Sequence, residues 1–302
     1  MKRVLVTGAT GFIGARAVPL LRARGYEVHA IGRTRPEDRD LEFHSADLLD
    51  ADAVRAVTLK IRATHLLHLA WDVTPGRYWR ASENLDWVSA SLQLARAFEA
   101  AGGRRAVFAG TCAEYQWGAP RFFEATTPCV PATLYGAAKD ALRRLLTYYG
   151  DSGGLSVGWG RIFFLYGPGE KPGRLVSDAI RCLVKVAPFP TTHGNQRRDF
   201  LHVDDVAGAF VALIDCNAQG PVNIGSGAAI SVRSVLDIVA SEIGNADCLQ
   251  FGARTLAEGE PMVIEADVTR LTQEIGFKPL YDIKGGIAQT VAWWKRNCAE
   301  SR

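Results

Sequence analysis

Tyr135 and Lys139 stand four residues apart in the segment Tyr-Gly-Ala-Ala-Lys, inside a helical pattern. Side chains at positions i and i+4 are neighbours on one helix face, which places a phenol beside an ammonium. An unperturbed phenol has a pKa of about 10, and a nearby positive charge lowers that pKa by stabilising the tyrosinate. The pair could therefore exchange a proton with an alcohol or a ketone. The alternative is an ordinary solvated helix face, where this spacing is common.

Three glycines form a second chemical signal near the start of the chain. Gly8, Gly11 and Gly14 follow a short apolar run and precede a helical pattern. Gly8 allows a tight exit from the strand, Gly11 lets the backbone approach a pyrophosphate, and Gly14 permits close packing of the helix on the sheet. The helix is expected to start at Phe12, so that Phe12 and Ile13 face an anion. The turn predicts a dinucleotide ligand, although strand-to-helix turns also favour glycine for conformational reasons.

The elements that would position these groups alternate along the first half of the chain. Strand-like runs at 3–7, 27–32, 65–70, 106–110 and 156–163 are separated by helical patterns at 12–24, 51–61, 82–101 and 135–151. Such alternation predicts an α/β fold with a parallel, doubly wound sheet of the Rossmann type.

The alternation lapses beyond residues 166–169, where glycine- and proline-bearing loops surround helical patterns at about 175–186, 203–216, 231–243 and 283–295. We expect a dinucleotide-binding domain over 1–165, with segments near 200–225 returning to it. A smaller, interleaved substrate-binding α/β part is expected over 166–302.

Composition excludes several classes of protein. The 302 residues are 48% apolar and 22% charged, which matches an ordinary globular protein, and the net charge of +3 with dispersed basic residues argues against nucleic-acid binding. Six scattered cysteines without CxxC pairs argue against a disulfide framework or a metal site. Since neither a signal peptide nor a twenty-residue apolar stretch is present, we expect a cytoplasmic protein without membrane contact.

Together these motifs resemble the extended short-chain dehydrogenase/reductase family, in its group of NAD(P)-dependent sugar-nucleotide epimerases, dehydratases and 4-ketoreductases. The resemblance spans nearly the whole chain. It rests on segments that occur in the family's order and at about its spacing, namely residues 7–14, 47–48, 68–70, 108–115, 131–139, 161–168, 198–205 and 223–227.

The resemblance implies a set of catalytic roles. Thr111 would hydrogen-bond the reacting oxygen, Tyr135 would transfer the proton, and Lys139 would hold the nicotinamide ribose while depressing the pKa of Tyr135. A donor aimed at an oxygen that gains negative charge stabilises the transition state. Asn84 resembles the family's helix asparagine, and the alternative for Asn84 is a helix cap.

The resemblance also implies cofactor contacts. Asp47 and Leu48 would contact the adenine, while Leu69 and Ala70 would lie beside the pyrophosphate. In NAD-selective sites an acidic residue about 20 positions beyond the glycine turn binds the ribose, whereas an arginine accommodates a 2′-phosphate. Gly32 stands where the acid would be and Arg33 follows it. The sequence therefore predicts NADP(H) as cofactor; the alternative is that Arg33 is an ordinary loop cation.

The reaction is narrowed by the residues after Thr111. Dehydratases of the family carry an acid pair there, whereas this chain has Cys112 and Ala113. Glu114 is displaced by one residue and on a strand would point to the opposite face. Dehydration is therefore not expected.

We predict an NADPH-dependent reductase of a nucleotide-linked 4-keto-6-deoxyhexose, with hydride delivered to C4 and a proton from Tyr135. A nucleotide-sugar epimerase, a reductase of a non-nucleotide carbonyl and a non-catalytic NADP-binding sensor remain as alternatives.

Expected substrate contacts include two departures from the family pattern. Phe164 replaces an asparagine that contacts the sugar diphosphate, and Ala257 replaces an arginine. Arg174 and Arg198 are expected to reach phosphate. Trp71 would narrow the pocket or stack on a ring, unless it is a core aromatic. The full expected substrate set is Trp71, Thr111, Cys112, Phe164, Arg174 and Arg198. A homodimer is implied through the helices at 82–101 and 135–151.

Overall fold

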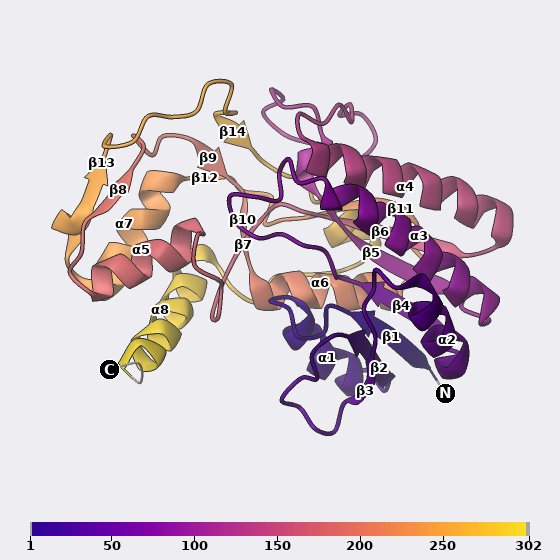
Figure 1. Cartoon of the computed structure of the whole chain (residues 1–302). Helices are drawn as coiled ribbons and strands as arrows, with labels where there is room; N and C mark the ends of the chain where they lie inside the picture. Colours follow the sequence, from indigo (N-terminus) through magenta and orange to yellow (C-terminus); the bar gives the residue numbers. More distant parts are fainter. Residues whose placement is uncertain (1, 300–302) are drawn as a thin grey trace.

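A seven-stranded sheet forms the centre of the computed structural model, which describes residues 2–299 (Figure 1). Its strand order is β11-β6-β5-β4-β1-β2-β3, and every neighbouring pair is parallel. The strands are β1 (Arg3–Thr7), β2 (Glu27–Gly32), β3 (Glu42–Ser45), β4 (His65–His68), β5 (Arg105–Thr111), β6 (Ser156–Ile162) and β11 (Gly220–Ile224). The expected parallel sheet is confirmed.

Helices cover both faces of this sheet. Val4 and Val6 of β1 belong to one buried cluster with α1 (Gly14–Ala23) and α6 (Val203–Asp215), whereas Leu5 belongs to a second cluster. That second cluster includes α2 (Ala51–Ile61), α3 (Glu83–Ala100) and α4 (Leu134–Gly153). Successive side chains of a strand point to opposite faces, so a doubly covered sheet must be apolar on both. The Rossmann-type, doubly wound fold is thus confirmed.

The first helix differs from its expected start. It begins at Gly14, and Phe12 and Ile13 lie in the preceding turn. The turn is closed by a 2.9 Å hydrogen bond from the Gly11 amide to the Gly8 carbonyl, with Gly8 at a φ of 71°. Because this turn uses the residues up to Ile13, the helix starts two residues later than the apolar pattern indicated.

The remaining elements build a smaller part on one side of the molecule (Figure 1). α5 (Leu175–Val184), α7 (Val232–Ile243) and α8 (Ile283–Ala299) contribute to a third buried cluster. Short strands accompany them: β7 (Phe164–Tyr166), β8 (Phe189–Thr191), β9 (Arg197–Arg198), β10 (Phe200–His202), β12 (Ile230–Ser231), β13 (Leu249–Phe251) and β14 (Val263–Ile264). Between β10 and β12 the chain returns to the large sheet through α6 and β11.

Three short helical turns complete the fold: η1 (Cys112–Glu114), η2 (Ala246–Cys248) and η3 (Arg270–Glu274). Within residues 2–299, no helix is long and apolar enough to cross a membrane. In the same part of the chain, no three His, Cys, Asp or Glu side chains are arranged to hold a metal ion. Cys112, Cys129, Cys182, Cys216 and Cys248 are free, and the side chain of Cys298 lies outside the described residues.

Glu170 is a buried carboxyl in the turn that leads from β7 to α5. It accepts a hydrogen bond from the Ser177 amide at 3.2 Å. Burial raises its pKa to about 8 from an ordinary value of 4.5. The folded protein therefore holds this proton over a pH range in which the unfolded chain releases it.

We predict that the stability contributed by protonated Glu170 is fully present below about pH 4.5 and is lost as the pH rises to about 8. The substitution Glu170→Gln removes the titration and keeps a hydrogen-bond acceptor. Wild type should lose at least about 1 kcal/mol more unfolding free energy than the variant between pH 5 and pH 8. Urea unfolding at several pH values measures this difference, and parallel pH dependences of the two proteins would contradict it.

Candidate active site

The glycine turn at the end of β1 is shaped by close backbone contacts. A Cβ at Gly14 would lie 2.1 Å from the Gly8 carbonyl oxygen, and a Cβ at Gly8 would lie 2.9 Å from the Ala70 amide nitrogen. Gly11 is exposed between them. Two of the glycines are thus required by packing, while the third presents bare backbone to the outside. This cradle fits the pyrophosphate of a dinucleotide.

A buried hydrogen-bond chain fixes the strand ends beside this turn. Thr7 Oγ1 lies 2.8 Å from His68 Nδ1, and His68 Nε2 lies 2.9 Å from Ser91 Oγ. Ser91 donates to the Trp87 carbonyl, so it must accept from His68, and Thr7 then donates to His68 Nδ1. Burial lowers the pKa of His68 to about 3. His68 of β4 is therefore neutral and links β1 and α3 through its two hydrogen bonds.

The expected catalytic residues meet at the end of β5. Thr111 is the last residue of β5, and α4 supplies Tyr135 and Lys139. The Thr133 hydroxyl caps α4 by accepting from the Gly136 amide at 3.1 Å, which fixes the helix start. Lys139 Nζ donates to the Ala109 carbonyl at 2.8 Å, and the Thr111 hydroxyl lies close enough to Tyr135 to influence the pKa of the phenol. All three side chains are buried.

Burial controls the titration of this group. It raises the pKa of Tyr135 above its ordinary value, while the nearby Thr111 hydroxyl acts in the opposite direction. The expected lowering of the Tyr135 pKa by Lys139 is therefore wrong for this structure, because desolvation outweighs neighbouring charge. Lys139 is itself affected, since burial lowers its pKa to about 7. Tyr135 is accordingly a protonated phenol, ready to donate.

Glu114 lies in η1 and not on a strand, so the expectation of an opposite-facing strand residue is wrong in its geometry. The turn forms because Thr111 Oγ1 accepts from the Ala113 amide while Glu114 Oε1 accepts from the Thr111 amide at 2.8 Å. The fully buried Glu114 carboxylate also accepts from Arg161 Nε at 2.7 Å and Trp159 Nε1 at 2.9 Å. Both oxygens of Glu114 are therefore bound by protein groups in the interior.

The two residues after Thr111 provide no acid. Cys112 and Ala113 are buried beneath the site, and burial raises the pKa of the Cys112 thiol to about 12. Cys112 is therefore a neutral thiol at physiological pH, and the end of β5 presents a hydroxyl rather than a carboxylate.

An aromatic cluster encloses Tyr135, and the sequence analysis singled out only one of its members. Trp71, Tyr78 and Trp79 meet the Tyr135 ring edge-on, with centroids 6.4, 4.9 and 5.7 Å away. The segment between β4 and α3 supplies all three. Their concentration within nine positions around Pro75-Gly76 was the available signal.

Asn84 holds this segment together. Its Nδ2 donates to the carbonyls of Tyr78 and Ala81, each at 2.8 Å, and its Oδ1 accepts from Trp71 Nε1 at 2.9 Å. Asn84 is buried within the first turn of α3 and does not cap that helix, whose preceding residue is Ser82. The asparagine therefore fixes the orientation of the Trp71 ring.

Both expected phosphate-binding arginines contact protein groups in this structure. Arg198 Nη2 donates to Glu260 Oε1 at 2.7 Å, and its guanidinium lies 5.6 Å from the Phe164 ring centroid. Arg174 Nη2 donates to the Val73 carbonyl at 3.0 Å, so it binds the aromatic segment. Phe164 and Arg198 are thus brought together, while the Arg174 guanidinium lies 5.4 Å from the ring centroid of Tyr78, which contacts Tyr135.

The expected adenosine contacts lie at the ends of β2 and β3. Arg33 is exposed immediately after β2, and the Arg35 guanidinium lies 5.6 Å from the Phe43 ring centroid. Asp47 is exposed and accepts from the Leu49 amide at 3.0 Å, whereas Leu48 is buried. Leu69 and Ala70 are half-buried beside the glycine turn.

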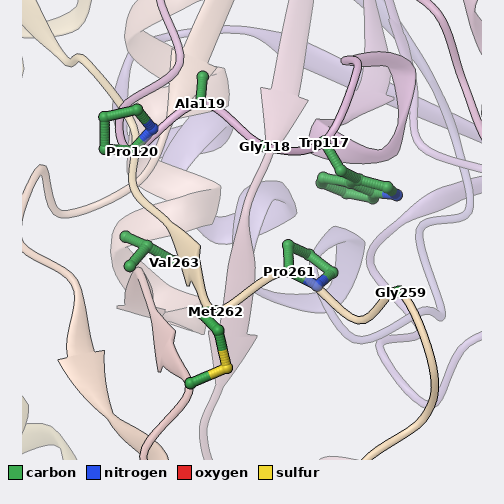
Figure 2. A pocket seen from close by; sticks show the side chains of 8 residues that line it. All are labelled: Trp117, Gly118, Ala119, Pro120, Gly259, Pro261, Met262 and Val263. Carbon is green, nitrogen blue, oxygen red and sulfur yellow. The ribbon is translucent and has the colours of Figure 1, made fainter.

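A pocket of about 300 Å³ lies between Trp117 and the loop that carries Pro261 and Met262 (Figure 2). Trp117 also packs against the buried cluster of Tyr78, Ala113 and Tyr135, so it links the pocket to the surroundings of Tyr135. Across the opening lie Pro261 and Met262, in the same loop as Glu260. The pocket is lined by Trp117, Gly118, Ala119, Pro120, Gly259, Pro261, Met262 and Val263.

Comparison with known proteins finds one family model and several proteins that are similar to this chain. The model of the NAD dependent epimerase/dehydratase family matches residues 4–225. A UDP-glucose 4-epimerase of Mycolicibacterium smegmatis is 30% identical over 320 residues, which cover 97% of this chain and 98% of that protein. A UDP-glucuronate 4-epimerase of Thermodesulfobacterium geofontis is 24% identical over 97% of this chain and 96% of its own length. The Thermus thermophilus UDP-glucose 4-epimerase, solved in complex with NAD, has a TM-score of 0.86 at 28% identity, covering 97% of this chain and 99% of that one.

The buried Glu114–Arg161 pair generates a stability prediction. The substitution Glu114→Gln leaves Arg161 charged and buried without its counter-ion, so we expect a loss of about 3–5 kcal/mol of unfolding free energy. Glu274→Gln is the matched control, because the Arg270–Glu274 pair is far more exposed and should contribute less than about 1 kcal/mol. Equal losses in urea unfolding of the two variants would refute the structural role of Glu114.

Proposed function

The chain belongs to the NAD dependent epimerase/dehydratase family and is an enzyme of the extended short-chain dehydrogenase/reductase type, and we propose that it reduces a 4-keto sugar. The proposed substrate is a 4-keto-6-deoxyhexose linked to a nucleoside diphosphate, and the proposed cofactor is NADP(H). The observation that carries the proposal is a protonated, buried Tyr135 beside the Thr111 hydroxyl, at a strand end where the nearby Glu114 carboxylate is bound to Arg161.

The chemistry of these residues fits reduction of a carbonyl. A bound nicotinamide dinucleotide supplies the hydride, and the carbonyl oxygen gains negative charge as the hydride reaches carbon. The Thr111 and Tyr135 hydroxyls stand together to donate to that oxygen, and such donors stabilise the transition state. Tyr135 then transfers its proton to complete the alcohol.

The end of β2 supports NADP(H) over NAD(H). Gly32 offers no carboxylate to bind ribose hydroxyls, and Arg33 is exposed without an ion-pair partner among residues 2–299. A guanidinium binds phosphate through a planar fork of donors. A phosphorylated, reduced nicotinamide pool is what a stoichiometric reductase uses, so this preference supports net reduction.

Epimerisation is the second candidate, and the comparisons favour it. All three relatives described above are named 4-epimerases of UDP-sugars, and the one from Thermus thermophilus was solved in complex with NAD. An epimerase of this kind also needs hydride and proton transfer, so the Thr111, Tyr135 and Lys139 group serves either reaction. The two functions differ in whether the reduced cofactor is consumed.

A nucleotide diphosphate in the substrate is supported by Arg198. Its guanidinium lies beside Phe164, in the part of the chain that follows the catalytic strand, and it is held by a single carboxylate from the loop that lines the pocket. A diphosphate would offer this buried arginine a stronger anionic partner than Glu260. Recognition of the hexose itself is left to the aromatic side chains around Tyr135.

A homodimer is a further part of the proposal. α3 and α4 pack side by side and expose apolar side chains, with Leu85 at 59%, Leu145 at 51% and Tyr148 at 77% exposure. Pairing these helices with those of a second copy would bury this apolar surface in a four-helix bundle.

Cofactor preference is tested by titrating NADPH and NADH into the protein. We expect NADPH to bind at least about tenfold more tightly, since a charge-assisted hydrogen bond contributes about 1.5–3 kcal/mol. Arg33→Ala should weaken NADPH binding by a similar factor and leave NADH binding unchanged. Equal affinities in the wild type would remove the argument for net reduction and favour the epimerase.

The proton donor is tested with a nucleotide-linked 4-keto-6-deoxyhexose, following loss of reduced nicotinamide absorbance. Tyr135→Phe should lower turnover at least about a hundredfold, because removal of one such donor commonly costs 10²–10³ in rate. Tyr148→Phe is the control, as it makes the same change on the exposed side of α4. Unchanged turnover in Tyr135→Phe would exclude the proposed mechanism.

A further inference from the structure

Lys139 carries its ammonium in an unusual place. The side chain is 3% exposed, and among residues 2–299 no carboxylate lies within ion-pair distance of Nζ. One donor is used by the Ala109 carbonyl at 2.8 Å. The ammonium also lies over the ring of Trp71, whose centroid is 3.7 Å from Nζ. A buried ammonium without a counter-ion is strongly disfavoured unless its surroundings stabilise the charge.

Trp71 can provide that stabilisation. The face of an indole carries negative potential, and among aromatic side chains it attracts cations most strongly, above all where water is excluded. The ring also keeps solvent from the ammonium without introducing a negative charge beside Tyr135. An acidic residue in the same place would attract Lys139 but would also oppose formation of a tyrosinate.

The ring is held in position by groups other than Lys139. Trp71 Nε1 donates to Asn84 Oδ1, and the two carbonyls bound by Asn84 Nδ2 determine which way that amide faces. Trp87 stacks behind Trp71, with a centroid distance of 6.0 Å and an interplanar angle of 28°. The indole face is thus preorganised, and the lysine reaches across to it from α4.

We infer that Trp71 is a positioning residue, which holds the ammonium of Lys139 at the end of β5 and keeps it protonated through its indole face. The consequence for catalysis rests on the proposed function, in which Lys139 must be charged to bind a ribose and to support proton transfer from Tyr135. The contact between the ring and the ammonium is independent of any substrate.

Among the described residues, the titratable groups around Lys139 are neutral or already paired, so Trp71 is left to stabilise the charge of the ammonium. Tyr135, one turn earlier on α4, is a neutral phenol, and His68 from β4 is neutral because burial lowers its pKa to about 3. Glu114 from η1 favours the charged lysine, but it is already bound to Arg161. Burial lowers the pKa of Lys139 to about 7, and the indole face acts against that shift.

Nuclear magnetic resonance of protein labelled with ¹³C at the lysine ε-carbon tests the contact in the wild type. The chain has eight lysines, and loss of one signal in Lys139→Gln assigns the resonance. The ε-methylene of Lys139 should resonate clearly upfield of the other seven, because it lies over an aromatic ring. A Lys139 signal within the range of the other lysines would overturn the inference, and no Trp71 variant needs to fold for this result.

The pKa of Lys139 is then followed by pH titration in Trp71→Leu and Trp71→Phe. Trp71→Leu should lower this pKa by about one unit, and Trp71→Phe should retain part of the effect because a ring face remains. Trp79→Leu is the matched control, since Trp79 contacts Tyr135 but not Lys139. An unchanged Lys139 pKa in Trp71→Leu, or an equal shift in Trp79→Leu, would contradict the proposed role.

These measurements need neither cofactor nor substrate, so they remain decisive if the proposed 4-keto sugar is wrong. If the ring contact is confirmed but the activity assay fails, the proposed substrate is wrong. If the enzyme is active but the ring contact is absent, the proposed role of Trp71 is wrong.

Discussion

Exclusion of water at the carboxyl end of β5 is the constraint on which the site depends. Thr111, Tyr135 and Lys139 are all buried there, and desolvation moves both titratable groups toward their neutral forms. A phenol that stays protonated is a proton donor, and the Thr111 hydroxyl beside it is a second donor for the same oxygen. The aromatic segment between β4 and α3 closes the site, and Asn84 fixes that segment by contacts with two backbone carbonyls.

The residues after Thr111 are the reason that reduction, and not dehydration, is proposed for this chain. Expulsion of water from a sugar needs an acid and a base near the ring, whereas the residues after Thr111 are an alanine and a neutral thiol. Glu114, the nearest carboxylate in sequence, neutralises Arg161 in the interior and accepts a hydrogen bond from the Thr111 amide at the end of β5. Reduction of a carbonyl, by contrast, needs no carboxylate: a bound nicotinamide dinucleotide would supply the hydride, and Thr111, Tyr135 and Lys139 would serve the proton transfer.

Much of this could be predicted from motifs that are local in sequence. Short-range rules govern the glycine turn, the alternation of strands and helices, and the spacing of Tyr135 and Lys139. These rules were enough to predict the parallel sheet and the meeting of the expected catalytic residues at the end of β5. β3 was missed because its side chains are half-buried or exposed at the sheet edge, which leaves no apolar pattern. The start of α1 was placed early because a turn and a helix share the same apolar residues.

Properties that depend on tertiary contacts were beyond sequence reasoning. Glu114 was assigned to a strand because periodicity cannot reveal that the Thr111 side chain starts a helical turn. The Tyr135 pKa was expected to fall because helix spacing shows the nearby lysine but not the degree of burial. Nor could the sequence show that Arg198 is held by Glu260 or that Trp71 faces Lys139, since these pairs lie 62 and 68 positions apart and meet only in the fold.

The central claim, net delivery of hydride to C4, is tested most directly with isotope. The protein would be incubated with NADPH deuterated at C4 of the nicotinamide and with a nucleotide-linked 4-keto-6-deoxyhexose, and the product examined by mass spectrometry and proton resonance. A reductase yields one deuterium at C4 of the sugar for each NADPH oxidised. A parallel incubation would offer a nucleotide hexose in its alcohol form together with oxidised nicotinamide, which must accept hydride from C4 before an epimerase can return it. Inversion at C4 in that incubation with no net change in cofactor, and no transfer of deuterium from NADPH to the 4-keto sugar, would contradict the proposal and identify an epimerase.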